Sequence, residues 1–369
     1  MSRLRCVLNC AICGAIVLAL ALGGALLPDG AVSSSERRAL NQWPGLNWRE
    51  IASGEFAREL DSYMLDQIPL RDAFLRLNAW LRLDVMRQRD IDGAYRLDGG
   101  VYQLDYPLDE DSVRYAMSRF EAVRARYLAD KPVYLAIIPD KNYFVAENAG
   151  YPSLDYAALT ALARESLANS VYIDLFDSLN ISDYYRTDPH WSQDGLSGVV
   201  DALMAGMGRN WRFDAERYEM RELSPFYGAY YARVGMSVEP DVLRYLTNAN
   251  IEQVEVKLLD QRGEFQEAGV YALDRFKGID GYDVFLHGAQ PVVTLVNPNA
   301  ATGDSLIVLR DSFGSSIAPL LCEEYARITL VDIRYISPEL LGEYVDFSDA
   351  TAALVLISTT LLNSGGALR

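Results

Sequence analysis

The sequence is poor in histidine and cysteine, and this scarcity excludes several kinds of site. Only two histidines and four cysteines occur in 369 residues. Cys6, Cys10 and Cys13 lie in the apolar N-terminal segment, so Cys322 is alone in the rest of the chain and cannot form an intradomain disulfide. A zinc site would lack ligands as well. We therefore expect no metal and no metal-dependent hydrolase, and nothing in the sequence predicts a cofactor.

Positive charge is also scarce. Asp and Glu number 51 against 34 Lys and Arg, the formal net charge is -17, and no Lys/Arg-rich run follows the N-terminus. Because nucleic-acid binding depends on clustered cations that neutralise phosphates, this composition argues against it. The 23 tyrosines suit carbohydrate contact, but they suit half-buried strands equally well.

One long apolar run does occur, from about Cys6 to Leu27, and Arg3 and Arg5 precede it. It is long enough to cross a bilayer as a helix, which takes roughly 20 residues. Positive charge before the run and none just after it predicts a single-pass cell-membrane protein with an extracytoplasmic C-terminal domain. Small residues at 23–25 leave a cleaved signal peptide and secretion as the alternative. In both cases the folded part works outside the cytoplasm.

The remainder divides into parts of different character. We expect a membrane anchor or signal segment over 1–30, a linker and helical segment over 31–98, and an α/β domain over 99–369. Within 48–89, apolar residues recur at three- and four-residue spacing, which predicts two helices with a break near Pro69. A stretch at about 212–295 alternates less cleanly, and we interpret it as an inserted lobe flanking the main sheet.

Short apolar runs alternate with helical patterns in the α/β part. We predict helices over 112–130, 154–168 and 192–207, and strands over 132–138, 171–176, 305–309, 327–333 and 353–357. Short buried strands separated by helices predict a mostly parallel sheet with helices on both faces.

A serine stands directly after the strand predicted over 305–309, in Asp311-Ser312-Phe313-Gly314. Ligands of α/β folds bind at the carboxyl ends of strands, so a hydroxyl here is well placed for chemistry. The backbone N–H of Ser312, together with that of Gly314, would be the donors to a developing oxyanion. The alternative is that Ser312 is only a helix N-cap.

One of the two histidines lies two residues from a carboxylate, in Asp188-Pro189-His190-Trp191. A serine nucleophile needs a base, and the base works best when a carboxylate holds its tautomer. Residues two apart in an extended segment face the same side, so Asp188 and His190 can act together. The alternative is an ordinary solvated loop histidine.

Together, Asp-x-His-Trp at 188–191 and Asp-Ser-Phe-Gly at 311–314 resemble the DHHW proteins and the alginate O-acetylation proteins of the SGNH-hydrolase-like superfamily. Weaker matching pieces are Glu36-Arg37-Arg38-Ala39-Leu40, Pro139-Asp140-Lys141 and Asp332-Ile333-Arg334-Tyr335. The resemblance implies a three-layer, flavodoxin-like α/β fold. It also implies a catalytic triad in which Ser312 is the nucleophile, His190 the base and Asp188 its orienting carboxylate.

Two departures from the family pattern bear on the site. Pro189 takes the place of the second DHHW histidine, and the segment 285–290 lacks the more familiar glycine pair with Asn or Asp. Candidates for oxyanion or substrate contacts are Gly314, Gly288, Asn142, Lys141 and Trp191. Asn297 and Asn299 are further possible amide donors, and Lys141 and Arg310 can equally be structural partners of neighbouring aspartates. His287 is the competing base, although its nearest preceding carboxylate, Asp283, is four residues back.

Two functions remain open. The first is an extracytoplasmic, serine-dependent O-acyl (acetyl) transferase or esterase that acts on a cell-surface polysaccharide. The resemblance favours transfer, with acetyl delivered by a membrane-bound O-acyltransferase partner. The second is a catalytically inactive cell-envelope binding or assembly protein on the same fold, because a fold alone does not prove activity.

Overall fold

The computed structural model describes residues 3–33, 36, 38–231, 238–260 and 262–364, and it separates the chain into two compact units. The first unit comprises residues 1–91 and 231–237. The second comprises residues 92–230 and 238–369. The α/β architecture lies in the second unit.

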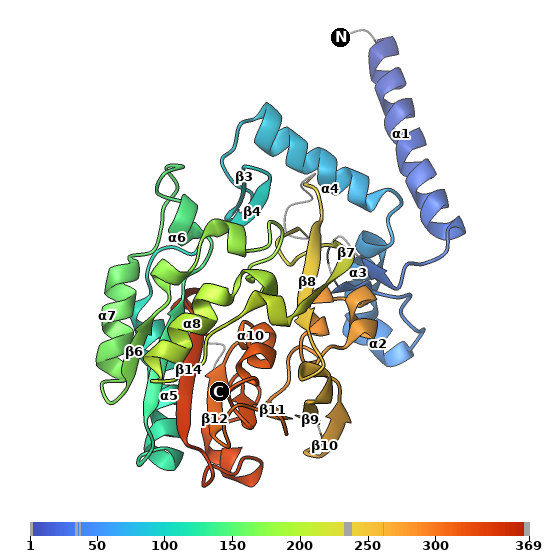
Figure 1. Ribbon diagram of the computed structural model, residues 1–369. Coiled ribbons are helices and arrows are strands. Elements are labelled where there is room, and N and C mark those ends of the chain that lie inside the picture. The colour runs from blue at the N-terminus through green and yellow to red at the C-terminus, as the bar shows by residue number, and fades with distance from the viewer. Residues whose placement is uncertain (1–2, 34–35, 37, 232–237, 261, 365–369) are drawn as a thin grey trace. The chain divides into compact units, whose positions relative to one another are not determined.

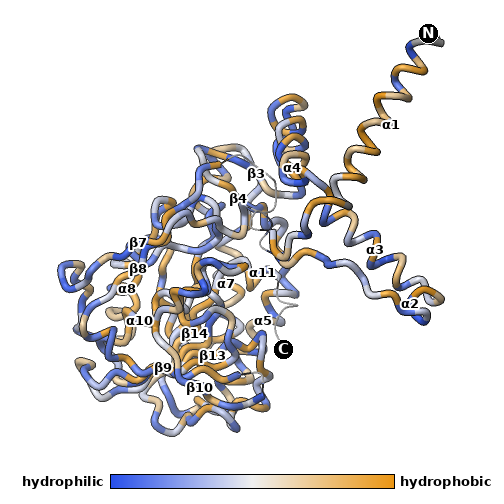
Figure 2. The backbone as a smooth tube through the Cα atoms, turned by 90° about the vertical axis from the view of Figure 1, so that its right-hand side faces the viewer, coloured by the Kyte–Doolittle hydropathy of each residue, from blue (hydrophilic) through white to orange (hydrophobic). Residues whose placement is uncertain are grey.

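The first unit is mainly helical. Its elements are α1 (Arg3–Leu26), the short strands β1 (Val32–Ser33) and β2 (Arg38–Ala39), α2 (Trp48–Ser53), α3 (Glu55–Asp66), α4 (Arg71–Trp80) and the π-helical turn η1 (Leu81–Val85). Residues Arg5–Gly24 of α1 have a mean hydropathy of 2.4 and are long and apolar enough to cross a membrane. Figure 2 shows how continuous this hydrophobic run is. A signal sequence shares this signature, so the length and composition of the helix fit an anchor and a signal segment equally well.

The second unit is built on one eight-stranded sheet, in the order β10-β9-β11-β13-β12-β14-β5-β6. Five adjacent strands are parallel: β13 (Arg327–Val331), β12 (Ser305–Arg310), β14 (Ala352–Ser358), β5 (Val133–Ile138) and β6 (Val171–Asp174). Three strands extend the sheet beyond β13 by antiparallel pairing: β11 (Val292–Val296), β9 (Glu255–Leu259) and β10 (Phe265–Ala268). The sheet is therefore mixed but mostly parallel, as predicted.

Helices cover both faces of this sheet (Figure 1). Alternate residues of β12 explain why, since Leu306 and Val308 belong to one buried cluster while Ile307 and Leu309 belong to another. The first cluster includes residues of α8 (Ser197–Gly206) and α10 (Gly314–Leu321). The second includes residues of α5 (Glu110–Tyr127), α7 (Tyr156–Ser166) and α11 (Thr359–Asn363). This is the three-layer α/β arrangement expected from the sequence.

Two small antiparallel sheets complete the unit. They are β3 (Ala94–Leu97) with β4 (Gly100–Gln103), and β7 (Glu219–Phe226) with β8 (Asp241–Thr247). In the stretch interpreted as an inserted lobe, β7 and β8 form a separate ribbon, whereas β9 and β10 add to the main sheet.

Several element boundaries differ from prediction, and two of these differences have a clear physical cause. The helix predicted to begin at Ser192 begins at Ser197, because Gln193–Gly195 forms a separate 3-10 turn and Leu196 occupies the N-cap position. The helical region 48–89 holds three α-helices rather than two. Gly54, with a φ of 79°, separates α2 from α3, since a left-handed residue ends a helix.

Candidate active site

Ser312 lies in the tight turn that joins β12 to α10. Asp311 shapes this turn, since its Oδ1 accepts the N–H of Phe313 at 3.1 Å and its Oδ2 accepts the N–H of Ser358 at 2.9 Å. The second bond ties the turn to the end of β14, the neighbouring strand. The side chain of Asp311 is thus committed to backbone donors and leaves the adjacent serine at the carboxyl edge of the sheet.

The segment carrying Asp188 and His190 brings both side chains to this serine. The Nε2 atom of His190 lies 2.7 Å from Ser312 Oγ, and its Nδ1 atom lies 2.6 Å from Asp188 Oδ1. Because an ionised carboxylate only accepts hydrogen bonds, the ring proton belongs on Nδ1 and the lone pair of Nε2 faces the hydroxyl. The three predicted residues therefore form a hydrogen-bonded Ser-His-Asp chain with the geometry of an activated nucleophile.

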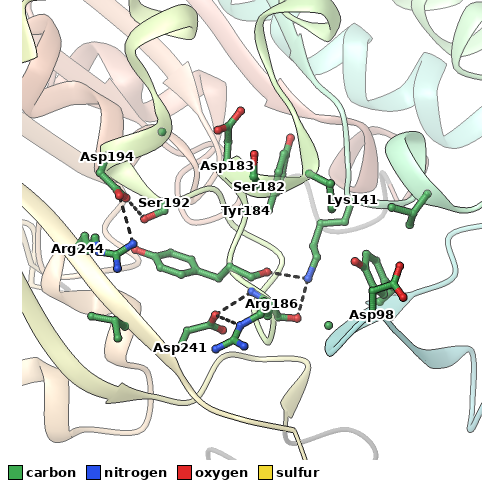
Figure 3. Close-up of a pocket in the computed structure, with 17 residues that line it drawn as sticks. Asp98, Lys141, Ser182, Asp183, Tyr184, Arg186, Ser192, Asp194, Asp241 and Arg244 are labelled. Carbon is green, nitrogen blue, oxygen red and sulfur yellow. Dashed lines mark hydrogen bonds and ion pairs between the residues drawn. The ribbon is translucent and has the colours of Figure 1, made fainter.

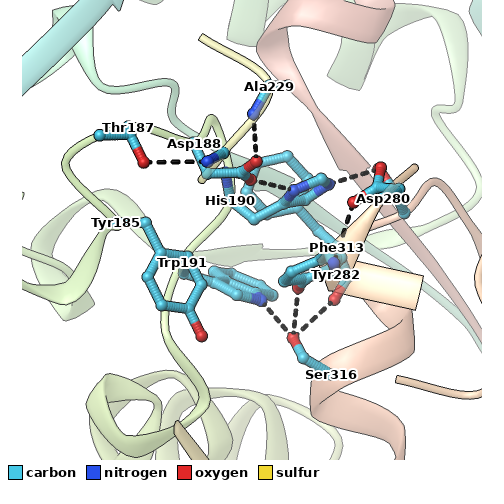
Figure 4. A network of polar contacts seen from close by, with 12 residues as sticks. Tyr185, Thr187, Asp188, His190, Trp191, Ala229, Asp280, Tyr282, Phe313 and Ser316 are labelled. Atoms are coloured by element: carbon cyan, nitrogen blue, oxygen red, sulfur yellow. Dashed lines mark hydrogen bonds and ion pairs between the residues drawn. The ribbon is translucent and has the colours of Figure 1, made fainter. Parts of the chain in front are cut away.

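Asp188 is fully buried and held from three sides. Its Oδ1 also accepts the N–H of His190 at 3.1 Å, and its Oδ2 accepts the N–H of Ala229 at 2.7 Å (Figure 4). These donors replace the water that burial removes and keep the carboxylate in one orientation.

The segment that supplies Ala229 depends on a glycine. A Cβ built on Gly228 would lie 2.4 Å from both Asp188 Cβ and Thr187 O, so only glycine lets this segment approach so closely. Gly228 N–H also donates to Thr187 Oγ1 at 3.0 Å. Neither Gly228 nor Ala229 was predicted from the sequence to belong to the site. The only available signal was a glycine within an aromatic-rich stretch.

Aromatic rings hold the imidazole of His190. The Tyr282 ring stacks on it, with centroids 3.9 Å apart and planes within 7°, and the Phe313 ring lies 4.8 Å away. Ser316 joins this cage by accepting hydrogen bonds from Trp191 Nε1 and the Tyr282 hydroxyl, both at 2.8 Å (Figure 4). Burial raises the pKa of Tyr282 well above its usual value, so the phenol stays a neutral donor. Trp191, predicted as a site residue, thus supports the site through its hydrogen bond to Ser316.

Lys141 is buried beneath the loop that carries the triad. Its Nζ donates to the carbonyls of Val101, Tyr185 and Arg186 at 2.8, 2.8 and 2.9 Å, and it lies 3.3 Å from that of Asp188. Burial lowers the pKa of Lys141 to about 7, and the charges of Asp188 and Asp241 oppose that shift. Through these hydrogen bonds, Lys141 Nζ connects the backbone that leads to His190 with the backbone of β4.

Asn142 is also occupied by neighbouring groups. Its Nδ2 donates to Gln103 O at 2.5 Å, and its Oδ1 accepts from the Tyr95 hydroxyl at 2.8 Å. Its backbone N–H donates to Asp140 Oδ1 at 2.7 Å, which fixes the turn after β5. The structure gives Asn142 a role in joining this turn to the β3–β4 hairpin.

The remaining candidates have no hydrogen bond to the triad among the described residues. Gly288 has a φ of 77°, and its N–H donates to Phe285 O at 3.1 Å. The half-buried ring of His287 has a pKa lowered by burial and then by Arg275. Nδ2 of Asn297 donates to Cys322 O, and that of Asn299 donates to Gln253. His190, and not His287, is therefore the histidine that the fold brings to Ser312.

Two backbone amides at the turn differ in their availability. Gly314 N–H donates to Asp311 O at 3.1 Å, so it would have to leave that bond to reach an oxyanion. Ser312 N–H has no acceptor among the described residues, and it stands just before the first turn of α10, where the helix dipole favours negative charge. Ser312 N–H is the better placed donor of the two.

A cavity of about 730 Å³ lies beside the triad loop (Figure 3). Tyr184, Tyr185 and Arg186 line it, together with Lys141 and Asp194, whereas the three triad residues do not. Residues 184–186 of the loop thus line this cavity, whereas Asp188 and His190 do not.

The comparisons with known proteins agree with this architecture. The family model of DHHW proteins matches residues 160–331. A DHHW family protein from Eubacterium siraeum is 19% identical over 75% of this chain and 94% of its own, with a TM-score of 0.61. Bacillus cereus PatB1 with a sulfonyl adduct is 19% identical over 73% of this chain and 95% of its own, with a TM-score of 0.58. The O-acetyltransferase domain of Pseudomonas putida AlgJ is 15% identical, with a TM-score of 0.45.

No curated protein matches the chain. The DHHW resemblance and the α/β fold inferred from the sequence are confirmed, whereas the roles of the individual site residues stay predictions.

Proposed function

We propose that this chain, which matches the DHHW protein family, is an extracytoplasmic O-acyl (acetyl) transferase or esterase that acts on a cell-surface polysaccharide. One observation carries the proposal: the continuous chain from Asp188 Oδ1 through the His190 ring to Ser312 Oγ, with links of 2.6 and 2.7 Å. A serine that is merely a helix N-cap has no need of a histidine whose other ring nitrogen is held by a buried carboxylate.

The first half-reaction forms an acyl-enzyme. Ser312 Oγ attacks the carbonyl carbon of an acetyl ester while His190 Nε2 accepts the hydroxyl proton. The tetrahedral oxyanion that results is stabilised by Ser312 N–H at the start of α10. When this intermediate collapses, the bond to the leaving oxygen breaks and His190 returns its proton to that oxygen. Ser312 is left as an acetyl ester.

The second half-reaction reverses these steps with a new nucleophile. A sugar hydroxyl or water gives its proton to His190 Nε2 and attacks the acetyl carbon, and collapse returns that proton to Ser312 Oγ. Attack by the sugar hydroxyl is transfer, and attack by water is hydrolysis. The same three residues serve both outcomes, so the acceptor that reaches the acyl-enzyme decides between them.

The polysaccharide acceptor and a membrane-bound O-acyltransferase partner follow from the resemblance to alginate O-acetylation proteins. The apolar helix α1 supports this assignment, because it would hold the domain on the outer side of a membrane or direct it there.

Covalent labelling tests the activated serine. The full chain in detergent is treated with a fluorophosphonate or a sulfonyl fluoride, the latter suggested by the sulfonyl adduct of Bacillus cereus PatB1. We expect stoichiometric labelling of the parent chain and none of Ser312→Ala. His190→Ala should label far more slowly. Ser118→Ala, which removes a hydroxyl from the exposed face of α5, is the control and should label like the parent.

Two results would contradict the proposal: a folded parent chain that fails to label, or undiminished labelling of Ser312→Ala. The first would favour an inactive cell-envelope binding protein. For a chain that labels, p-nitrophenyl acetate as donor, with and without a soluble glycan, then separates transfer from hydrolysis. Transfer gives acetylated glycan, whereas hydrolysis gives free acetate alone.

A further inference from the structure

An exposed apolar stripe runs along α4 and its continuation η1. Leu70, Phe74, Leu77 and Leu81 follow one another at spacings of four, three and four residues, which places them on one helix face. Their exposed fractions are 72%, 44%, 47% and 40%. Ala79, on the opposite side of the helix, is buried. The apolar stripe therefore faces outward. An exposed apolar patch of this kind is unfavourable in water.

Cations border this stripe. From Leu70 through Arg89 the sequence has five arginines and two aspartates, although the whole chain carries a net charge of -17. Helical spacing puts Arg82 on one side of the stripe and Arg76 on the other. Arg71 lies on the same side as Arg82, but its guanidinium is paired with Glu36. An apolar face with arginines along its borders is the pattern of a helix that lies in a membrane interface, where arginines meet anionic headgroups.

The beginning of the stripe contacts the end of the candidate membrane span. A Cβ built on Gly23, near the end of α1, would lie 2.8 Å from Pro69 Cγ, so the Pro69 ring packs directly on that helix backbone. Gly30 N–H donates to Gln67 Oε1 at 2.9 Å, and Gln67 Nε2 donates to Gly30 O at 3.0 Å. These contacts hold the start of α4 at the place where α1 would leave the hydrocarbon core.

We propose that α4 and η1 lie in the interface of the membrane that α1 crosses, with the stripe buried at the boundary between headgroups and acyl chains. A lipid surface is the occupant that these observations favour, because the stripe continues from the membrane span and arginines border it on both sides. This proposal does not depend on the acyl-transfer activity. Its consequence is that the chain contacts the bilayer through a surface helix as well as through its span.

Collision accessibility of a spin label tests this contact. The full chain, with its four cysteines replaced by alanine, is reconstituted into vesicles of phosphatidylcholine and phosphatidylglycerol in equal parts. A nitroxide is attached at Leu77→Cys or Phe74→Cys on the stripe, and at Asp72→Cys away from it as the control. Power saturation then compares accessibility to oxygen, which concentrates in lipid, with accessibility to a water-soluble nickel chelate. Circular dichroism verifies that each labelled chain keeps its helix content.

The proposal predicts that both stripe positions are accessible to oxygen and protected from nickel, with an oxygen-to-nickel ratio several-fold above that at Asp72. High nickel accessibility at the stripe would mean that it faces water and would overturn the proposal. Low accessibility to both reagents would overturn it as well, because a protein surface or a second copy of the chain would then cover the stripe.

Discussion

His190 Nε2 and Ser312 Oγ lie 2.7 Å apart although 122 residues separate them in the chain. Asp188, only two residues from the histidine, completes the contact from the other side of the ring. The histidine and its carboxylate thus come from one short segment. The serine follows β12, a strand in the parallel part of the sheet, so the packing of the sheet places it beside them.

Asp188→Asn should keep the size of the side chain but remove the acceptor that holds the proton on His190 Nδ1. An amide group can donate to Nδ1 and so favour the wrong tautomer. We expect a loss in kcat on the order of 10⁴-fold, the size seen when a triad aspartate is replaced in this way. Steady-state kinetics with p-nitrophenyl acetate would measure it, and a variant within tenfold of the parent would argue against a triad.

Gly228→Ala should disturb the site from outside the triad. The added Cβ would meet Asp188 Cβ and Thr187 O at 2.4 Å, so the segment must move and Ala229 N–H must leave Asp188. We expect a loss of about 1–3 kcal/mol in the free energy of unfolding, together with a lower kcat. Urea denaturation measures the first quantity. Gly303→Ala is the matched control, because nothing lies within 4 Å of its added Cβ and both quantities should stay unchanged.

Two substitutions at Tyr282 separate its ring from its hydroxyl. Tyr282→Phe keeps the ring stacked on His190 and loses only the bond to Ser316, so kcat should remain within a few-fold of the parent. Tyr282→Ala removes the stack and should lower kcat much further, because the imidazole gains freedom to rotate. Equal losses in the two variants would show that the hydroxyl, rather than the ring, positions the histidine.

Lys141→Met should leave four backbone carbonyls around the triad loop without their shared donor. Unsatisfied buried polar groups cost about 1–3 kcal/mol, and the loop that carries His190 should also loosen. We expect both a lower free energy of unfolding and a lower kcat. Lys131→Met, whose Nζ lies 3.4 Å from Ser348 O at the surface, is the control and should change neither quantity. A fully active Lys141→Met variant would show that these hydrogen bonds from Lys141 do not position the loop.

Asp105 should make stability depend on pH. Burial, with the nearby charge of Asp140, raises the pKa of Asp105 to about 6, against a bond from Asn363 that lowers it. The folded state therefore binds more protons than the unfolded state between about pH 4 and 6, so this contribution to stability is lost as pH rises through that window. Asp105→Asn should reduce this loss in the free energy of unfolding by on the order of 1–3 kcal/mol. Urea unfolding at about pH 4 and about pH 6, the two ends of this window, would measure the change, with the exposed Glu147→Gln as the control.

The local features of this protein were readable in the sequence. Apolar runs at 132–138, 305–309 and 353–357 became β5, β12 and β14, because consecutive strand residues are buried on both sheet faces and must all be apolar. Asp188 and His190 were recognisable as a pair, since two residues in one extended segment share a side whatever the rest of the chain does.

Tertiary structure alone decided which groups surround that pair. Ala229 reaches Asp188 only because Gly228 permits close packing, and Tyr282 stacks on His190 from a segment 92 residues away. Lys141 was ambiguous in the sequence, where an Asp neighbour suggested a simple ion pair. Its backbone acceptors come from Val101 and from residues 185–188, which lie together only after the sheet and its loops have packed. Periodicity and spacing describe a residue's own segment, whereas hydrogen-bond and stacking partners from distant segments are set by the packed fold.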